Sequence, residues 1–205
     1  MSGKSFALPQ RLYIIRHGET DWTLTGQHTG RSDIPLNSHG KDEAHGLKAW
    51  LAHISFDHVW VSPRLRARET ADLAGLGFAA QIEVDLAEWN YGDYEGRTSA
   101  DIRRERPDWS MFRDGCPNGE SPDEVSDRAD RLILRLSELG GNIALFSHGE
   151  FGRALGVRWI GLPFITGEHF TFATASVSIL TYKSDNPNVR VIEIWNAGPA
   201  LSAGL

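Results

Sequence analysis

Two histidines occupy corresponding positions, each just beyond a short apolar segment of the chain. Arg16 and His17 follow the apolar run 12–15, and His148 follows the apolar run 143–146 after one serine. Both runs have the length and composition of buried strands, and open α/β sheets bind ligands beyond the carboxyl ends of their strands. We therefore expect the two imidazoles and the Arg16 guanidinium to face one pocket, where they can hold a phosphoryl group.

The chemistry that such a pocket can perform is phosphoryl transfer. A neutral imidazole is a good nucleophile towards phosphorus, and the N–P bond that it forms is labile enough to be hydrolysed in a second step. Guanidinium groups can make paired hydrogen bonds to the phosphoryl oxygens. A glutamic acid that is held protonated can supply the proton for the leaving oxygen and, as a carboxylate, can then take a proton from water.

Alternating strand and helix patterns surround these residues. Strands are expected over 11–16, 57–61, 81–84, 142–147, 176–182 and 189–195. Helices are expected from Asn37 or Ser38 to about His53, from a cap at Ser62-Pro63 to about Leu73, from the capping box Ser121–Glu124 to Gly140-Gly141, and from about Glu150 to Ile160.

This alternation predicts an α/β fold, in which a mainly parallel sheet is covered by helices on both faces as a three-layer α/β/α sandwich. Only the polar segment 183–188 joins the last two strands, and it is too short for a crossover helix. Those two strands should therefore form an antiparallel hairpin at the edge of the sheet.

Length and composition are consistent with one globular domain over residues 1–205. Residues 89–120 differ from the rest, because they are rich in glycine, arginine, tryptophan and acidic residues and show little apolar periodicity. Stretches of this kind inside compact domains are often functional. We expect an insertion that covers the pocket, with a helix near 98–106 and with Trp89 and Trp109 at the pocket entrance.

Charge and cysteine content narrow the partners. The formal net charge is −6, which disfavours nucleic acid and anionic membrane as main partners, and no apolar run reaches the length of a membrane span. The first ten residues contain no apolar core of a signal peptide, and Cys116 is the only cysteine. These features favour a cytoplasmic protein that acts on a small-molecule phosphate ester, and they leave open whether it forms a homo-oligomer.

Residues 16–20 read Arg-His-Gly-Glu-Thr, which resembles the R-H-G-x-[ST] signature of the histidine phosphatase superfamily, branch 1, with its phosphoglycerate mutase-like fold. Further segments match the family pattern in the same order over nearly the whole chain. They are Thr29-Gly30 with 33–37, the arginine-rich segment 62–71, Leu86-Ala87-Glu88 with Tyr91-Gly92, Gly119-Glu120-Ser121, and Ser147-His148-Gly149. Six ordered matches identify the chain, by resemblance, as a member of this family.

The resemblance implies a role for each matching residue. His17 would attack phosphorus and become phosphohistidine, and Glu88 would act first as proton donor and then as base. The phosphoryl oxygens would be held by Arg16, Arg66 and His148, so that no metal or other cofactor is implied. Further substrate contacts are expected at Thr23, Thr29, Gly30, Tyr91, Gly149 and Arg153, with Thr29 and Gly30 offering a hydroxyl or backbone N–H to phosphate.

Departures from the family pattern distinguish between its members. Cofactor-dependent mutases carry arginine and histidine after the catalytic glutamate and an asparagine in the position of Thr23, whereas this chain has Trp89 and Asn90 after Glu88. A mutase must retain its phosphohistidine in a strongly basic pocket, so the loss of these basic groups favours transfer to water. The sequence thus predicts a phosphatase.

Segments 22–30, 88–96 and 113–120 resemble the sedoheptulose-1,7-bisphosphatase-like sugar phosphatases. The resemblance implies metal-independent hydrolysis of a small phosphorylated metabolite, a sugar phosphate or bisphosphate, through phosphohistidine. A bisphosphate would need a second anion site, for which Arg153 and Arg113 are candidates. The alternatives are a phosphoglycerate mutase, a phosphoprotein phosphatase and a phosphate-binding regulatory protein.

Overall fold

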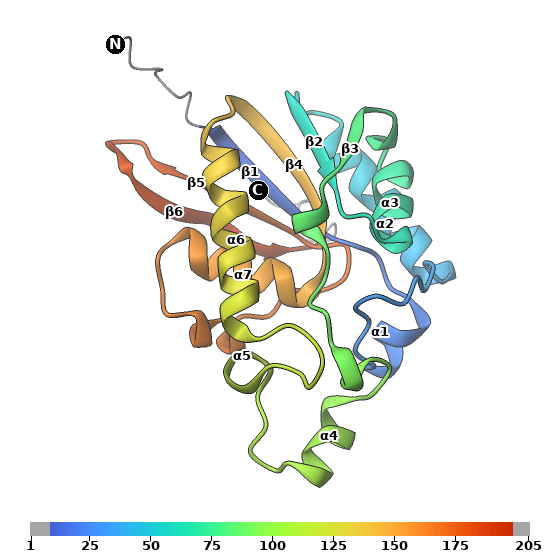
Figure 1. Cartoon of the computed structure of the whole chain (residues 1–205). Coiled ribbons are helices and arrows are strands. Elements are labelled where there is room, and N and C mark those ends of the chain that lie inside the picture. Colours follow the sequence, from blue (N-terminus) through green and yellow to red (C-terminus); the bar gives the residue numbers. More distant parts are fainter. Residues whose placement is uncertain (1–8, 199–205) are drawn as a thin grey trace.

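A mixed six-stranded sheet forms the centre of the structure, a computed structural model that describes residues 9–198 (Figure 1). The strand order is β3-β2-β4-β1-β5-β6. The strands are β1 (Pro9–Arg16), β2 (His58–Val61), β3 (Ala80–Ile82), β4 (Gly141–Ser147), β5 (Val177–Lys183) and β6 (Asn186–Ala197). Neighbouring strands are parallel from β3 to β1, and β5 and β6 add an antiparallel edge. The predicted α/β class, the mainly parallel sheet and the terminal hairpin are confirmed.

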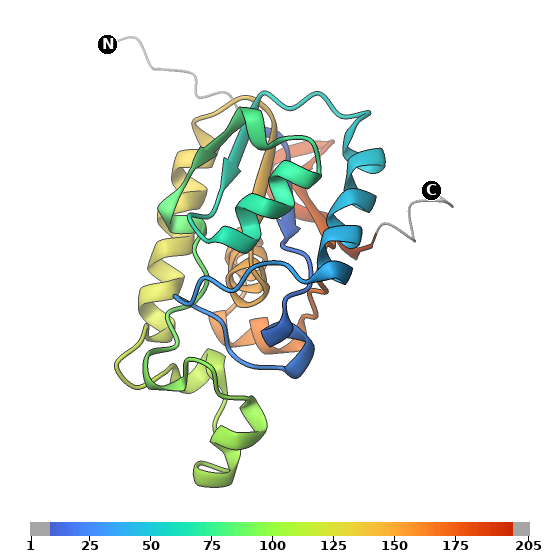
Figure 2. The same ribbon diagram turned by 90° about the vertical axis from the view of Figure 1, so that its right-hand side faces the viewer.

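Helices cover both faces of this sheet. The longer helices are α2 (Ser38–Leu51), α3 (Leu65–Leu73), α6 (Pro122–Ser137) and α7 (Gly149–Trp159). Short α-helices are α1 (Asp21–Thr25), α4 (Ser99–Glu105) and α5 (Met111–Asp114), and 3₁₀ helices occupy Gly77–Ala79, Val84–Leu86, Gly92–Tyr94 and Phe164–His169. Figure 2 shows α2 and α6 on opposite sides of the molecule, with α4 projecting at one end.

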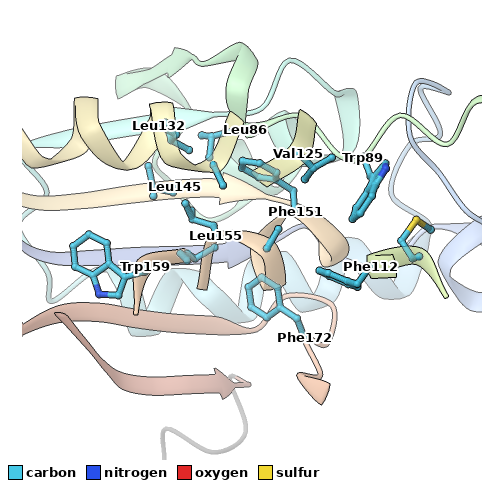
Figure 3. Packing of buried hydrophobic residues seen from close by; sticks show 14 of the residues in the cluster. Leu86, Trp89, Phe112, Val125, Leu132, Leu145, Phe151, Leu155, Trp159 and Phe172 are labelled. Atoms are coloured by element: carbon cyan, nitrogen blue, oxygen red, sulfur yellow. The ribbon is translucent and has the colours of Figure 1, made fainter. Parts of the chain in front are cut away.

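Alternation along the central strands builds two separate hydrophobic layers, because successive side chains of a strand point to opposite faces. On β1, Leu12 and Ile14 pack with the buried faces of α6 and α7. Their neighbours Tyr13 and Ile15 pack with α2 and α3 instead. Figure 3 shows part of the first layer, where Leu145 of β4 lies among side chains from α6 and α7. These layers make the predicted three-layer sandwich.

The strand register decides where the two histidines leave the sheet. Arg16 of β1 is the parallel partner of Ser147 of β4, so the following residues, His17 and His148, emerge side by side at the carboxyl ends. The His17 backbone N–H donates to the Ser147 carbonyl over 3.0 Å, which extends the pairing by one step. In Figure 1 the segments that carry α1, α4 and α5 gather beyond one end of the sheet.

Three expectations for individual elements need correction. The third strand ends at Ile82, and a 3₁₀ turn over Val84–Leu86 replaces its predicted end. Helix α3 begins at Leu65 with Arg64 as its N-cap, two residues after the predicted capping serine, Ser62. Helix α6 starts with the predicted Ser121 capping box but ends at Ser137, before the two glycines.

Two further sequence expectations concern helices. Helix α4, capped by Thr98, confirms the helix expected near 98–106. Within residues 9–198, no helix combines the length and the apolar character needed to cross a bilayer.

Candidate active site

His17 and His148 lie against each other at the carboxyl ends of β1 and β4. Their ring centroids are 5.2 Å apart and the ring planes meet at 62°, and both side chains are buried. Gly18, which follows His17, packs tightly on α2, because a Cβ at this position would lie 2.3 Å from the Gly40 carbonyl oxygen. The absence of a side chain at Gly18 therefore lets the strand exit turn close to the helix.

The His17 ring is held in one tautomer. Its Nδ1 lies 2.7 Å from the Gly18 carbonyl oxygen, which can only accept, so Nδ1 carries the proton and Nε2 keeps its lone pair. Arg66 Nε donates to that Nε2 over 3.2 Å. Burial, together with the charges of Arg66 and Arg16, holds the pKa of His17 well below its usual value. The imidazole is thus neutral at physiological pH, as a nucleophile requires.

Arg66 reaches this position from the first turn of α3 and is fully buried. Its Nη2 donates to the Thr29 carbonyl over 2.7 Å and its Nη1 donates to the Ser32 carbonyl over 3.1 Å. Burial lowers the pKa of Arg66 to about 10, which still leaves the guanidinium charged at neutral pH. The loop over residues 29–32 therefore serves to orient Arg66 through its carbonyl oxygens.

The same loop is tied down by a carboxylate. Glu95 Oε1 accepts from the backbone N–H groups of Gly30 over 2.9 Å and Ser32 over 3.0 Å. The Gly30 N–H, which the sequence suggested for phosphate, is therefore engaged. The sequence does not single out Glu95 for this role, because it is one of several acidic residues in this part of the chain.

His148 is oriented by Ser62, the residue that directly follows β2. The Ser62 Oγ lies 2.6 Å from His148 Nε2 and also accepts from the Arg64 backbone N–H over 3.3 Å. Because Ser62 can donate its own proton to Nε2, the His148 proton is placed on Nδ1. That nitrogen is buried and has no partner among the described residues. Burial, and to a lesser extent the charge of Arg66, hold the pKa of His148 well below its usual value.

Arg16 lies along the start of α7. Its Nη1 donates to the Phe172 carbonyl, while its buried Nε has no partner among the described residues. Burial lowers the pKa of Arg16, although the charges of Glu88 and Glu150 oppose this. A Cβ at Gly149 would lie 3.2 Å from Arg16 Cζ, so glycine at this position allows the guanidinium to approach the helix terminus.

Glu88 provides the carboxyl group of the site. It accepts the backbone N–H groups of Trp89 over 2.8 Å, Phe151 over 2.9 Å and Glu150 over 3.1 Å. These bonds favour the ionised form, but burial and the nearby charge of Glu150 outweigh them and raise the pKa of Glu88. A proton is therefore held on Glu88 to higher pH than on an ordinary glutamic acid, as a proton donor needs.

A partly buried ion pair holds the segment that carries Glu88. Arg128 of α6 makes paired bonds of 2.9 Å to the Glu120 carboxylate and donates to the carbonyls of Asp85 and Ala87. Glu120 in turn accepts the Asn90 backbone N–H over 2.8 Å. The chain on both sides of Glu88 is thus fixed to α6, which the sequence did not indicate for Arg128.

Arg16, His17 and Glu88 open into a cavity of about 230 Å³, whereas Arg66 and His148, which contact His17, are not among the residues that line it. Its walls include predicted site residues from four segments, namely Arg16, His17, Thr23, Thr29, Glu88, Tyr91 and Gly149. A second cavity of about 410 Å³ adjoins it, and His28, Ser99 and Glu150 line both. The two imidazoles, the two guanidiniums and the Glu88 carboxyl, whose pKa is raised, can together hold a phosphoryl group, attack it and, when Glu88 carries a proton, protonate its leaving oxygen.

A comparison with protein families agrees with this chemistry. The model of the histidine phosphatase superfamily (branch 1) matches residues 12–194. The chain belongs to this superfamily. It is thus a phosphoric monoester hydrolase, and its fold is the one that the family's solved structures share.

Three relatives show how far this similarity extends. The phosphatase is 39% identical to an acid phosphatase of Mycobacterium tuberculosis, over 95% of this chain and 97% of that protein. It is 35% identical to the sedoheptulose 1,7-bisphosphatase of Saccharomyces cerevisiae, over 76% of this chain and 69% of that protein. The solved structure of an open reading frame product of M. tuberculosis superposes with a TM-score of 0.85, at 37% identity, covering 93% of this chain and 98% of the other.

The structure of the phosphatase thus brings together all five residues expected to be catalytic. The weaker expectations fare unevenly. The Thr23 hydroxyl donates to the Thr20 carbonyl within a capping box, and Gly30 is not among the residues that line the first cavity. Arg153 lines the second cavity and pairs with Glu150.

Two tryptophans and Arg113 lie elsewhere than expected or only partly as expected. Trp89 is fully buried in the core, so the prediction that it lies at the pocket entrance is wrong. Trp109 lines the second cavity. Arg113 pairs with Asp114 near the surface and is absent from the walls of both cavities. Ser62 and Glu150 were missed as site residues, although Ser62 follows a strand and Glu150 follows the second histidine motif.

Proposed function

We propose that this phosphatase hydrolyses a small sugar phosphate or bisphosphate through a phosphohistidine at His17, without a metal. In the first step the Nε2 lone pair attacks phosphorus and the P–O bond to the leaving group breaks. The electron pair of that bond goes to the leaving oxygen, which takes the proton of Glu88. The Nδ1–H bond to the Gly18 carbonyl stabilises the positive charge that develops on the ring.

In the second step water attacks the phosphorus of phosphohistidine. Glu88, now a carboxylate, takes a proton from that water, and the N–P bond breaks with its electron pair returning to Nε2. Inorganic phosphate leaves, and His17 and Glu88 regain their starting states. The three backbone N–H groups that Glu88 accepts stabilise its ionised form between the two steps.

The observation that carries this proposal is a pair of buried nitrogens without partners in the residues expected to hold phosphate. They are Arg16 Nε and His148 Nδ1, and the other buried nitrogens without a partner among the described residues are Arg64 Nε and Arg153 Nε. Leaving such groups unsatisfied costs about 1–3 kcal/mol each. The oxygens of a phosphoryl group on His17 would supply the missing acceptors, and the Arg66 guanidinium adds positive charge beside Nε2.

The substrate class is supported by the relatives and by the second cavity. Among the relatives are a sedoheptulose 1,7-bisphosphatase and, at 33% identity, an adenosylcobalamin/alpha-ribazole phosphatase of Escherichia coli. The second cavity adjoins the phosphoryl site and has both aromatic and polar walls, which suit a carbohydrate. We extend the proposal to a cytoplasmic location and to residues 89–120 as a segment that covers the site within one domain over residues 1–205.

The test is a screen of phosphorylated metabolites in the presence of a chelator, with His17→Ala as the matched control. We expect turnover that chelator does not reduce, inhibition by vanadate, and complete loss in the variant. Rapid acid-free denaturation during turnover should trap phosphate on His17, detected by mass spectrometry. Activity that persists in His17→Ala would overturn the mechanism, and dependence on bisphosphoglycerate with transfer to phosphoglycerate would favour a mutase.

A further inference from the structure

The second cavity differs from the phosphoryl site in its charge. Two arginines, Arg103 and Arg153, and two glutamates, Glu150 and Glu168, contribute to its walls. Their formal charges cancel, since two positive groups face two negative ones. At the phosphoryl site, Arg16 and Arg66 stand near Glu88, whose raised pKa favours its neutral form, and Glu150 lies at the boundary of that site. The second cavity therefore offers no net positive charge to a second anion.

Glu150 lies at the junction of the two cavities. Its backbone N–H donates to Glu88, and its side chain lines both spaces. The carboxylate pairs with the Arg153 guanidinium one turn further along α7. Arg153 also donates to the Phe170 carbonyl over 3.0 Å. One of the two cations of this cavity is thus already paired with a carboxylate of the same helix, although its buried Nε has no partner among the described residues.

The remaining walls suit a neutral, hydroxyl-bearing group. The His28 ring stacks on Tyr91 with centroids 4.6 Å apart, and Trp109 meets it edge-on at 5.8 Å. Burial lowers the pKa of His28, which keeps this ring uncharged. Apolar ring faces beside a carboxylate that accepts and a guanidinium that donates can bind the C–H faces and the hydroxyls of a polyol together.

We propose that Glu150 determines specificity: the second cavity takes the neutral, hydroxylated remainder of a phosphate monoester, and Glu150 excludes esters that carry a second anion there. This inference rests on the proposed function and narrows it to monophosphates of polyols or sugars. Glu150→Gln would keep the shape of the side chain, remove the negative charge and release Arg153 as an anion receptor.

The experiment measures competition against p-nitrophenyl phosphate hydrolysis by two pairs of esters. The pairs are glycerol 3-phosphate with 3-phosphoglycerate, and fructose 6-phosphate with fructose 1,6-bisphosphate. Each pair compares a neutral remainder with one that carries an additional anion, and the inhibition constant reports binding whether or not the ester is hydrolysed. The quantity compared is the ratio of the two inhibition constants within a pair. A change that Glu150→Gln causes at Glu88 affects the phosphoryl group of both esters alike, so it cancels in this ratio.

We expect the wild-type protein to bind the neutral member of each pair more tightly. Glu150→Gln should shift the ratio towards the anionic member by about tenfold or more, because removing one charge a few ångströms from an anion has an effect of this order. The double variant Glu150→Gln, Arg153→Met should lose most of that shift. The control is Asp130→Asn in α6, which removes the ion-pair partner of Arg158 near the C-terminal end of α7. It should leave the ratio unchanged.

Two results would overturn the inference while leaving the proposed function intact. One is a wild-type preference for the anionic member of both pairs, and the other is an unchanged ratio in Glu150→Gln. Failure of the proposed function itself would look different, since the wild-type protein would then not hydrolyse p-nitrophenyl phosphate, or His17→Ala would hydrolyse it equally well.

Discussion

Replacing Ser62 by alanine tests whether the proton on His148 is positioned for catalysis. The hydroxyl is fully buried and lies 2.6 Å from His148 Nε2. A neutral imidazole carries one N–H, on either nitrogen, and Ser62 favours the form with the proton on Nδ1 by donating to Nε2. Ser62→Ala removes that preference, so part of the population moves the proton to Nε2 and presents a lone pair to the phosphoryl oxygens.

The size of the effect follows from the strength of one hydrogen bond. A net contribution of about 0.5–1.5 kcal/mol corresponds to a change of about two- to tenfold in the ratio of the two tautomers. Where the tautomers are otherwise equal in energy, the productive fraction falls to about one half, so we expect kcat to fall by up to about twofold in Ser62→Ala. The free energy of unfolding should fall by about 1–3 kcal/mol, because the Nε2 atom is left buried without its partner.

The assay is kcat for p-nitrophenyl phosphate, with urea unfolding measured on the same samples. His148→Ala provides the second arm of a double-mutant cycle, because Ser62 cannot act through an imidazole that is absent. In the His148→Ala background, Ser62→Ala should cost nothing further in kcat. An unchanged kcat in the single variant, or an equal loss in both backgrounds, would show that Ser62 acts only on stability.

Further predictions concern the carboxyl group, the histidines and the ion pair that holds the site. Glu88→Gln should reduce the first step, measured as kcat/KM, by about 10²–10⁴-fold for alkyl phosphates and far less for p-nitrophenyl phosphate, because nitrophenolate leaves without a proton; equal losses in this first step would contradict a proton donor. In the wild-type protein kcat/KM should rise as His17 loses its proton below its usual pKa and fall as Glu88 loses its proton above its usual pKa, and Glu88→Gln should abolish the fall. Burial keeps His148 unprotonated in the folded protein, whereas the unfolded imidazole takes up a proton below its ordinary pKa of 6.5. The free energy of unfolding therefore decreases as the pH is lowered. Between pH 7.5 and 5.5 the wild-type protein should therefore lose about 1.4 kcal/mol more stability than His148→Gln, as measured by urea unfolding at each pH. Arg128→Met should lower the free energy of unfolding by about 1–3 kcal/mol, since the partly buried Glu120 carboxylate loses its partner, whereas no measurable loss in urea unfolding would refute this.

Local patterns in the sequence were sufficient for the elements and for the catalytic group. Apolar runs that end in Arg16-His17 and in His148 identified the two strands, and the ordered motifs identified Arg66 and Glu88 in the same family pattern. The capping box at Ser121 started a helix where the structure has one. Such features depend on residues close together in the chain, so they can be recognised without knowledge of the fold.

Contacts between distant segments could be seen only in the tertiary structure. Ser62 looked like a helix cap, but its hydroxyl binds His148, 86 residues away, because β2 and β4 are neighbours in the sheet. Glu95 and Arg128 carry no motif that marks them in the sequence, yet each satisfies backbone groups of another segment. A charged residue can equally face water or a distant partner, and its local sequence does not decide between them.

The sequence by itself thus predicted which residues carry the chemistry, because strand exits and family motifs are local. The tertiary structure decided the protonation states and the charge available to the substrate. Burial sets the pKa values of His17, His148 and Glu88, and the pairing of Glu150 with Arg153 removes net positive charge from the second cavity. Both effects depend on how much solvent and which charges surround a group, and folding alone fixes these.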